Sequence, residues 1–384
     1  MRFLTLFLIL LIASANIFDV QADVDTNLPS LEFKRIRRIK STSSSRRLKR
    51  NKSRLIDVGH DIAYTTTVAI GTPPQVFTCQ IDTGSTDLWV PDASCVGVGC
   101  SKKHKFSSKH SVSYGGDGGP WGISYVDGSA ASGVTATDTV TVGGFVLKGQ
   151  QFARATRMDQ SFKPQPFDGL IGLAGPQMAA VPTAVTPIQN MKNHGYITRR
   201  SFGIWLGKST DGGSGEITFG GFNPAHIVGN LTSIPLVGSF DSTGSWTVQL
   251  SKVSLGGHDI VLTRKNGVAM LDTGTSLIFT SPTIADQINT ALGLGGHFSS
   301  QAQAYIIPCD AKPPDMTFTF GTASFTVPGR DLVVSLTRGV CNSAITPGDP
   351  GDGVSFLVGD TFLKNNYAYF DMDGSTIGLA QAKR

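Results

Sequence analysis

Hydrophobic residues along most of this chain occur in short runs that alternate with polar residues and end at Gly, Pro, Asn or Asp. Such runs are typical of β-strands bounded by turns, because successive side chains of a strand face opposite sides of its sheet. The pattern therefore predicts an all-β body. Its clearest strands are expected within residues 65–70, 76–81, 139–147, 216–219, 246–255 and 316–320.

One segment has the pattern of a helix instead. Ser281 precedes Pro282, and apolar residues follow at positions 284, 288 and 292, which share one helical face. Ser is a preferred N-cap residue, and Pro is favoured at the first helical position. We therefore expect a short helix that begins at Pro282, in a chain whose helices are few.

The chain also contains an internal repeat. Residues 81–86 (IDTGST) recur 190 residues later as residues 271–276 (LDTGTS). A second pair follows in step, because residues 170–172 (LIG) end 90 residues after Asp82 and residues 357–359 (LVG) end 87 residues after Asp272. Two matches at nearly the same offset predict two related β lobes, with a crossover near residues 231–236.

Length and composition agree with this division. The 384 residues exceed one ordinary domain, and 45 Gly, 19 Pro and 16% charged residues argue against a coiled coil, a disordered chain or a helical bundle. We expect an N-terminal lobe over residues 51–235 and a C-terminal lobe over residues 236–384. The net charge of +5 comes from residues 1–50, which carry 10 Lys and Arg against 4 Asp and Glu. The remaining chain is nearly neutral, so a nucleic-acid partner is not expected.

The first residues have the order of a secretory signal. A positive start is followed by an apolar run over residues 3–12 and by Ala13-Ser14-Ala15, a small-residue cleavage site. The alternative is a membrane anchor, but the run is shorter than the roughly 20 residues that span a bilayer. We expect a signal peptide over residues 1–15, no membrane anchor, and export to the outside or to an acidic endolysosomal compartment.

Two basic blocks follow the signal, at residues 34–40 and 46–50. Like charges do not pack together, and Arg47-Leu48-Lys49-Arg50 has the form of a basic processing site. We interpret residues 16–50 as a removable pro-segment, with a plain basic linker as the alternative. Two Asn-x-Ser/Thr sequons, at Asn51 and Asn230, are candidate glycosylation sites.

The repeated motif suggests a chemistry. Each copy places an Asp between an apolar strand and a Thr-Gly turn. If the lobes pair about a twofold axis, the carboxyl groups of Asp82 and Asp272 meet, and two adjacent carboxyl groups share one proton. Such a pair contains a base for a bound water and an acid for a carbonyl oxygen, and it needs neither a metal ion nor a cofactor.

At this point the body of the chain is seen to resemble the pepsin-like aspartic endopeptidases, over essentially all of residues 55–384. Residues 81–91 (IDTGSTDLWVP) are similar to the first signature of that family, and residues 270–276 (MLDTGTS) are similar to the second. Further similar segments are residues 167–174, 356–360 and 369–380. The resemblance implies a bilobal β fold with a central cleft.

The resemblance also implies roles for the residues of both motifs. Asp82 and Asp272 would be the catalytic pair. Each threonine after an Asp would brace the opposite loop, and each hydroxyl one residue beyond the Gly would bond the outer carboxylate oxygen. These supporting residues are Thr83, Gly84, Ser85, Thr273, Gly274 and Thr275.

Substrate-binding residues are implied in the same way. Tyr125 lies in a segment that resembles the mobile hairpin of the family, with its hydroxyl directed toward Trp89, although Val126 stands where the family usually has Gly. Asp127 would let the first specificity pocket accept a basic side chain. The remaining pocket residues would be Phe167 and Leu170, which are apolar, and Gln80, which makes the pocket more polar.

Five cysteines in an exported chain imply two disulfides and one free thiol. Cys95 and Cys100 are close enough for a small loop, and the resemblance pairs Cys309 with Cys341. Cys79 is expected to be a buried free thiol. A zinc site at Cys95, Cys100, His104 and His110 is the alternative, but its spacing is unusual and export favours a disulfide.

Together these features predict an aspartic endopeptidase that is made as a zymogen and cleaves protein or peptide substrates between bulky hydrophobic residues. We expect a monomer whose pro-segment covers the cleft until falling pH or a basic-site convertase removes it. The alternatives are a catalytically silent binding protein of the same fold and a structural or carbohydrate-binding β protein.

Overall fold

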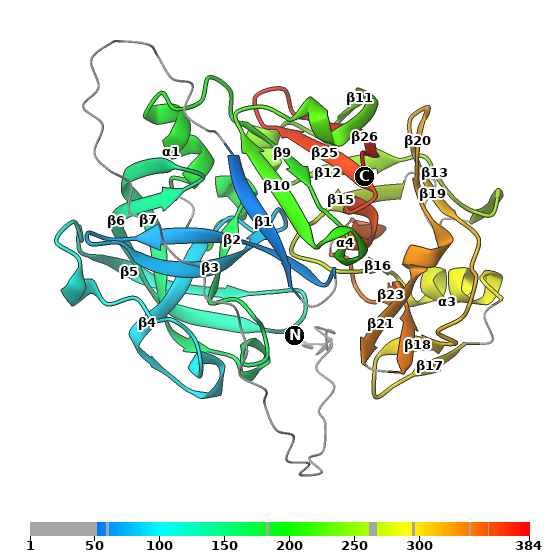
Figure 1. Ribbon diagram of the computed structural model, residues 1–384, viewed down its shortest axis with the longest axis horizontal. Helices are drawn as coiled ribbons and strands as arrows, with labels where there is room; N and C mark the ends of the chain where they lie inside the picture. The colour runs from blue at the N-terminus through cyan, green and yellow to red at the C-terminus, as the bar shows by residue number, and fades with distance from the viewer. Residues whose placement is uncertain are drawn as a thin grey trace.

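The computed structural model describes residues 52–58, 61–181, 184–260, 267–293, 296–337, 339–351 and 353–384 (Figure 1). The predicted signal peptide and pro-segment, residues 1–15 and 16–50, lie outside the described residues. The described chain is mostly β, with a few short helices. Among these residues, none of the helices is long and apolar enough to cross a membrane.

The first half of the chain supplies eleven of the strands in one large sheet. They are β1 (Lys52–Val58), β2 (Ala63–Ile70), β3 (Gln75–Asp82), β4 (Leu88–Val96), β5 (Asp117–Ser124), β6 (Ala130–Val142), β7 (Phe145–Met158), β8 (Gly169–Gly172), β9 (Ser201–Trp205), β10 (Ser214–Phe219) and β11 (Ile227–Pro235). The second half supplies the last two strands, β25 (Asn366–Asp371) and β26 (Thr376–Ala382). The strand order is β11-β26-β25-β9-β10-β1-β2-β3-β8-β4-β7-β6-β5.

Three smaller sheets are built by the second half. Their strands are β12 (Thr247–Leu250), β13 (Lys252–Leu255), β14 (His258–Ile260), β15 (Gly267–Leu271), β16 (Ile278–Thr280), β17 (His297–Ser299), β18 (Ala304–Ile307), β19 (Met316–Phe320), β20 (Ala323–Val327), β21 (Val333–Thr337), β22 (Val340–Ser343), β23 (Ile345–Pro347) and β24 (Phe356–Val358). The α-helices are α1 (Pro187–Asn193), α2 (Phe240–Thr243), α3 (Pro282–Ala291) and α4 (Asp360–Leu363).

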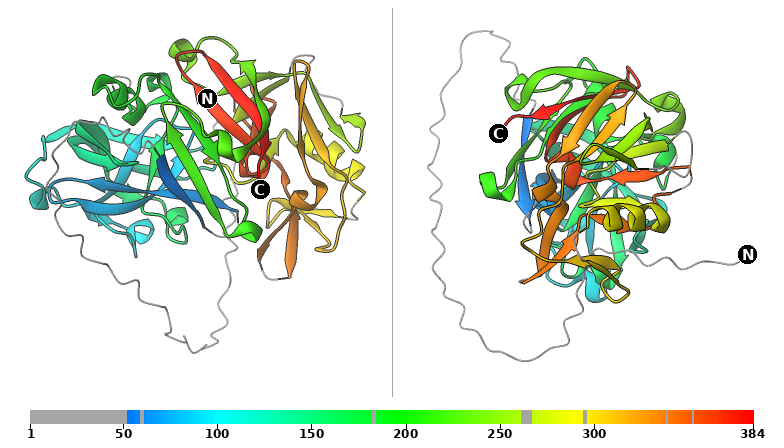
Figure 2. Two further views of the ribbon diagram at one scale, coloured as in Figure 1. Left: turned by 45° about the horizontal axis from the view of Figure 1, so that its top comes forward. Right: turned by 90° about the vertical axis from the view of Figure 1, so that its right-hand side faces the viewer.

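The two halves meet through the C-terminal hairpin. Strand β25 pairs with β9, and β26 pairs with β11, so the end of the chain lies in the sheet of the first half. Figure 2 shows this red hairpin between the green strands of the first half and the yellow and orange strands of the second. The expected crossover at residues 231–236 is mostly part of β11. It is an edge strand of the large sheet and not a free linker.

Most of the predicted strands are confirmed, but two of the predicted ranges each span parts of two strands. Residues 139–147 contain a turn, because Gly143 and Gly144 adopt positive φ angles of 57° and 81° between β6 and β7. Glycine tolerates this conformation because it lacks a Cβ atom. Residues 246–255 form two strands, β12 and β13, that are separated at Ser251.

The predicted helix is confirmed as α3. Ile284 and Ile288, together with Leu292 just beyond the helix, are buried as the periodic pattern indicates. Ser281 stands at the N-cap position, but its side chain makes no capping hydrogen bond. The predicted N-cap residue and the Pro at the first helical position are therefore both confirmed, although the Ser281 hydroxyl is buried without a partner in the described structure.

An aromatic cluster holds the halves together beneath the site. The Trp246 ring packs on Phe202, Phe240 and Phe370 at centroid distances of 5.7, 4.4 and 5.0 Å. Its indole N–H donates to the Leu173 carbonyl over 3.0 Å. Since Leu173 directly follows β8, this second-half tryptophan positions a strand of the first half.

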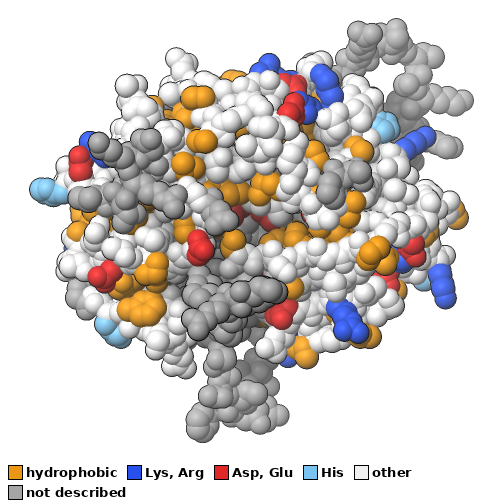
Figure 3. Space-filling view, turned by 180° about the vertical axis from the view of Figure 1, so that it is seen from behind, with side chains coloured by type: hydrophobic (Ala, Val, Ile, Leu, Met, Phe, Trp, Pro, Cys, Tyr) orange, Lys and Arg blue, Asp and Glu red, His pale blue; other side chains and the backbone are white. Residues whose placement is uncertain are grey.

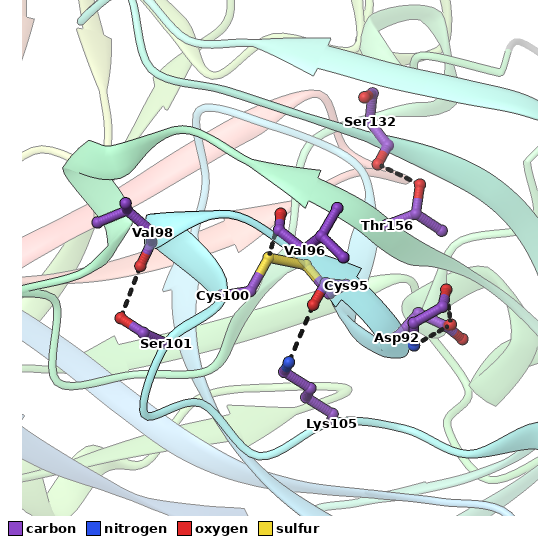
Figure 4. The surroundings of a disulfide bond; sticks show 10 residues. Asp92, Cys95, Val96, Val98, Cys100, Ser101, Lys105, Ser132 and Thr156 are labelled. Atoms are coloured by element: carbon purple, nitrogen blue, oxygen red, sulfur yellow. Dashed lines mark hydrogen bonds between the residues drawn. A yellow bond between two sulfur atoms is a disulfide. The ribbon is translucent and has the colours of Figure 1, made fainter.

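Both expected disulfides are present, at Cys95–Cys100 and Cys309–Cys341, and Cys79 is a buried free thiol. Figure 4 shows the first disulfide, with the Lys105 ammonium donating to the Cys95 carbonyl over 2.9 Å. Because this bond uses both sulfur atoms, the described structure does not form the alternative zinc site at these cysteines.

Candidate active site

Each Asp-Thr-Gly loop begins where a strand ends beside a parallel partner. Strand β3 ends at Asp82 and runs parallel to β8, and β15 ends at Leu271, before Asp272, and runs parallel to β24. The chain then returns antiparallel to the same partner, as β4 beside β8 and as β16 beside β24. Each carboxyl group is therefore carried by a loop that three strands hold in place.

Two glycines explain the second pair of repeated segments. A Cβ atom on Gly172 would lie 2.2 Å from the Thr86 carbonyl carbon, and one on Gly359 would lie 2.1 Å from the Thr275 carbonyl oxygen. Both distances are too short for any side chain. The strands that follow each motif can support its loop only if glycine stands at these two positions.

The structure brings Asp82 and Asp272 together. A Cβ atom on Gly84 would lie 2.6 Å from Oδ1 of Asp272, and one on Gly274 would lie 2.4 Å from Oδ1 of Asp82. Each loop glycine thus contacts the carboxyl group of the opposite loop. The two aspartates are 4% and 6% exposed, so the pair is nearly dehydrated but still reachable.

Matching hydrogen bonds orient the two carboxyl groups. The amides of Gly84 and Gly274 donate to Oδ1 of their own aspartates, both over 2.8 Å. The hydroxyl of Ser85 donates to Oδ2 of Asp82, and the hydroxyl of Thr275 donates to Oδ2 of Asp272 over 2.5 Å. Four of the predicted supporting residues, Gly84, Ser85, Gly274 and Thr275, therefore each donate a hydrogen bond to an aspartate.

The brace consists of the two buried threonines. The Thr273 amide donates to the Thr83 hydroxyl over 2.9 Å, and the Thr83 amide donates to the Thr273 hydroxyl over 3.1 Å. Each hydroxyl also donates to the chain of the opposite half, Thr83 to the Leu271 carbonyl and Thr273 to the Ile81 carbonyl. These four bonds cross the boundary between the halves, so they fix the separation of the carboxyl groups.

The environment favours a proton on this pair. The pKa of Asp82 is raised well above its usual value, first by burial and then by the negative charge of Asp272. A hydrogen bond with Asp272 raises it further, whereas the hydrogen bonds from Ser85 and Gly84 oppose the change. Two carboxyl groups this close cannot both ionise easily, so the pair shares one proton.

The turn between β5 and β6 covers the Asp82 side of the site. The Trp89 indole N–H donates to the Tyr125 hydroxyl over 2.7 Å, which is the contact that the resemblance implied. Burial, followed by the charge of Asp82, raises the pKa of Tyr125, so this phenol stays protonated. Val126 is 55% exposed, and its side chain therefore does not fill the space beneath the turn.

The floor beneath this turn is apolar. Phe167 and Leu170 are buried in one cluster with Trp89, and Tyr125 packs against that cluster. Asp127 accepts hydrogen bonds from the amide and hydroxyl of Ser129 at the end of the turn, and burial raises its pKa. Figure 3 shows a hollow on this molecule with acidic side chains at its bottom and hydrophobic side chains around it.

Gln80 makes a contact that the sequence did not predict. Its side-chain amide donates to the Gly274 carbonyl over 3.3 Å, so it contacts the opposite loop directly. The equivalent position two residues before the other aspartate is Met270, which has no donor. The two loops therefore have similar backbones, but Met270 cannot make the hydrogen bond that Gln80 makes.

Sequence reasoning missed Asp360, which directly follows the second supporting glycine. Its side chain is 0% exposed, and neither carboxyl oxygen has a hydrogen-bond partner in the described structure. Burial and then the charge of Asp272 raise the pKa of Asp360 well above its usual value. The repeat contained a signal for this residue. The position after the supporting glycine is Leu173 in the first half and Asp360 in the second.

Comparisons with known proteins agree with this geometry. A family model described as "Eukaryotic aspartyl protease" matches residues 63–382. Rhizopuspepsin of Rhizopus chinensis is 36% identical over 329 residues, which are 85% of this chain and 80% of the relative. Syncephapepsin of Syncephalastrum racemosum is 35% identical over 334 residues, 86% of this chain and 80% of the relative. Vacuolar protease A of Aspergillus fumigatus is 35% identical over 335 residues, 86% and 81% respectively.

Proposed function

The chain belongs to the eukaryotic aspartyl protease family, and from this premise we propose that Asp82 and Asp272 are the catalytic pair of this aspartic-type endopeptidase. The proposal is carried by the contact of each loop glycine with the carboxyl group of the opposite loop. A Cβ atom added to Gly274 or to Gly84 would lie only 2.4 or 2.6 Å from that carboxyl group. This contact supports the proposal because it brings two acids, one from each half, next to one another.

The pair acts by general acid and base catalysis. The ionised carboxylate takes a proton from a water molecule as the water oxygen attacks the carbonyl carbon of the peptide bond. The protonated partner gives its proton to the carbonyl oxygen, so a gem-diol forms. A proton then passes to the amide nitrogen, the C–N bond breaks, and a carboxylic acid and an amine leave.

A direct test uses purified protein with unfolded globin at acid pH, with and without a statine-type inhibitor. We expect peptide release that the inhibitor abolishes. Release that the inhibitor does not affect would assign the activity to another mechanism or a contaminant. No release in either sample would favour the catalytically silent binding protein.

We further propose that the substrate carries bulky hydrophobic side chains at the cleaved bond. The support is the apolar floor formed by Trp89, Phe167 and Leu170 beneath Tyr125. We also propose that Asp127 accepts Lys on the amino side of the bond. Because burial raises the pKa of Asp127, its ionised fraction grows with pH, so cleavage after Lys relative to Phe should increase as pH rises. A peptide library assayed at several pH values measures this ratio, and D127N should remove the trend.

Residues 16–50 are proposed to be the pro-segment. In support, β1 begins at Lys52, two residues after the basic site, and it pairs with both β10 and β2 inside the large sheet. A cut after Arg50 would leave this central strand whole. While the carboxylates of the hollow are ionised, the basic segment is attracted to them. Falling pH protonates those carboxylates and weakens this attraction.

N-terminal sequencing of the active protein tests the proposed processing. We expect the mature chain to begin at or near Asn51 after the secretory signal and pro-segment are removed. R50A together with K49A should delay processing by a basic-site convertase, whereas activation by acid alone would be unaffected. A mature chain that begins beyond Val58 would contradict the proposal, because β1 would be lost.

A further inference from the structure

Strand β11 is the last strand of the large sheet, and only β26 pairs with it along its length (Figure 1). Its other edge has no strand partner among the described residues. Unpaired N–H and C=O groups on such an edge are a template for pairing with another chain, and proteins usually protect them. The sequence of β11 contains none of the charged side chains that commonly provide this protection.

Strand β11 also contains a bulge. Val228 pairs with Gln381 and Thr232 pairs with Leu379, so three residues of β11 stand opposite one residue of β26. Gly229 adopts a positive φ of 73° at the start of this bulge. A bulge bends the strand and releases its extra residues from the ladder.

Asn230 and Leu231 of the sequon lie in this bulge, and Thr232, its third residue, is where pairing with β26 resumes. Asn230 and Thr232 are both exposed, and neither side chain takes part in a hydrogen bond between described residues. A Cβ atom on Gly229 would find no other atom within 4 Å, so the bulge projects into open space. The side-chain amide nitrogen of Asn230 is therefore accessible from solvent. The backbone around it is not held in an extended strand by pairing.

Apolar side chains lie beside the bulge. Val228 is 50% exposed, and Leu231 and Tyr369 lie together over Gly378. The Tyr369 ring contacts Phe222, which is 41% exposed, at a centroid distance of 5.4 Å. We call Phe222, Leu231 and Tyr369 the edge patch. This patch is apolar surface that lies next to the unpaired edge of β11.

We propose that Asn230 carries an N-linked oligosaccharide that shields the free edge of β11 and the edge patch. Oligosaccharyltransferase forms a bond between Nδ2 of Asn230 and the anomeric carbon of a lipid-linked oligosaccharide. The bond from that carbon to the lipid diphosphate breaks, and the proton lost by the amide leaves with the diphosphate. The attached sugars are hydrated, so they block strand pairing from another chain without burying polar groups.

The test secretes the full chain from a eukaryotic host behind a host leader in place of residues 1–15, which ensures that it meets the transferase. N51Q removes the other sequon. In this background, digestion with peptide:N-glycosidase should lower the mass by one oligosaccharide. The matched variant T232S keeps the sequon and should behave in the same way, whereas T232A and N230Q should show no loss. An undigested mass equal to that of the bare polypeptide in the N51Q protein would overturn the proposal.

Shielding has a separate readout. Light scattering at increasing concentration should show larger species for T232A and N230Q at concentrations where T232S remains dispersed. Equal scattering by all variants would overturn the shielding role. Activity on unfolded globin should be unchanged in every variant, because six strands separate β11 from β3 in the sheet. Since mass and scattering do not depend on proteolysis, a failure here is distinct from a failure of the catalytic proposal.

Discussion

The loops at Asp82 and Asp272 have nearly the same internal hydrogen bonds, but their surroundings differ. Each aspartate accepts from the amide two residues later and from a hydroxyl three residues later. Only the first loop lies beneath the turn that carries Tyr125, and the second lies beside Asp360, a buried acid whose oxygens have no hydrogen-bond partner in the described structure. Duplicate sequence thus produces duplicate local geometry, whereas the protonation of each carboxyl group depends on neighbours that are not duplicated.

The largest expected effect tests whether both loops are needed. D82N and D272N should each lower kcat by about 100-fold to 10,000-fold, because either change removes the shared proton chemistry of the pair. Hydrolysis of unfolded globin measures this loss. D259N, at an exposed aspartate paired with Lys252, is the control and should be fully active. Substantial activity in either catalytic variant would mean that the two halves are not equivalent in the reaction.

The next effect tests the brace between the loops. T83V and T273V each leave buried hydrogen-bonding groups without partners, which costs about 1–3 kcal/mol for each such group. We expect both variants to melt at lower temperature and to lose activity by similar factors. T83S and T273S keep the hydroxyl and should be close to wild type.

The brace also predicts coupling between its members. Because the two threonines bond each other, the losses in T83V and T273V should not add in the double variant. Chemical denaturation of the two single variants and the double variant measures the coupling. Additive losses would show that each threonine stabilises only its own loop.

A third effect concerns the pH dependence of the free energy of unfolding, to which Asp360 of the second half contributes. The pKa of Asp360 is raised in the folded protein, so the folded state holds a proton that the unfolded state releases. Its contribution to stability is therefore complete below the ordinary pKa of an aspartate and is lost as pH rises through the raised value.

D360N keeps the side chain neutral, and D360L copies Leu173 of the first half. D360N should gain stability relative to wild type as pH rises above the ordinary pKa of an aspartate, by about 1.4 kcal/mol for each pH unit up to the raised pKa, because its amide holds no proton that unfolding releases. Denaturation at several pH values measures the gain, which should disappear at low pH. A gain that does not depend on pH would attribute the effect to packing.

The smallest effect concerns the unequal contact of Gln80. Q80M copies Met270 and removes the donor to the Gly274 carbonyl. One hydrogen bond is worth about 1 kcal/mol, so kcat should fall about five-fold with little change in KM. Q80N keeps the amide but is too short to reach and should behave like Q80M. A wild-type kcat in Q80N would mean that polarity, and not the bond, is what matters at this position.

Much of the site was predictable because its geometry is local to the repeat. The amide and hydroxyl donors to each aspartate lie within three residues of it, so a short motif contains the whole network. The roles of Ser85 and Thr275, like the contact between Tyr125 and Trp89, came from the resemblance to a family. Periodicity located most strands, but it could not show that Gly143 and Gly144 divide one run into a hairpin.

The sequence by itself determined the duplicated β architecture, the two acids and the residues that orient each of them, because these follow from contacts between near neighbours in the chain. Only the tertiary structure decided the bond from Gln80 to Gly274, the isolation of Asp360 and the place of the C-terminal hairpin in the sheet of the first half. Each of these depends on residues far apart in the chain, from about 160 to 200 positions in two of the three cases. Hydrophobic pattern and local propensity contain no information on which distant backbone group a buried side chain will meet, because burial and pairing are set by the packing of the whole molecule.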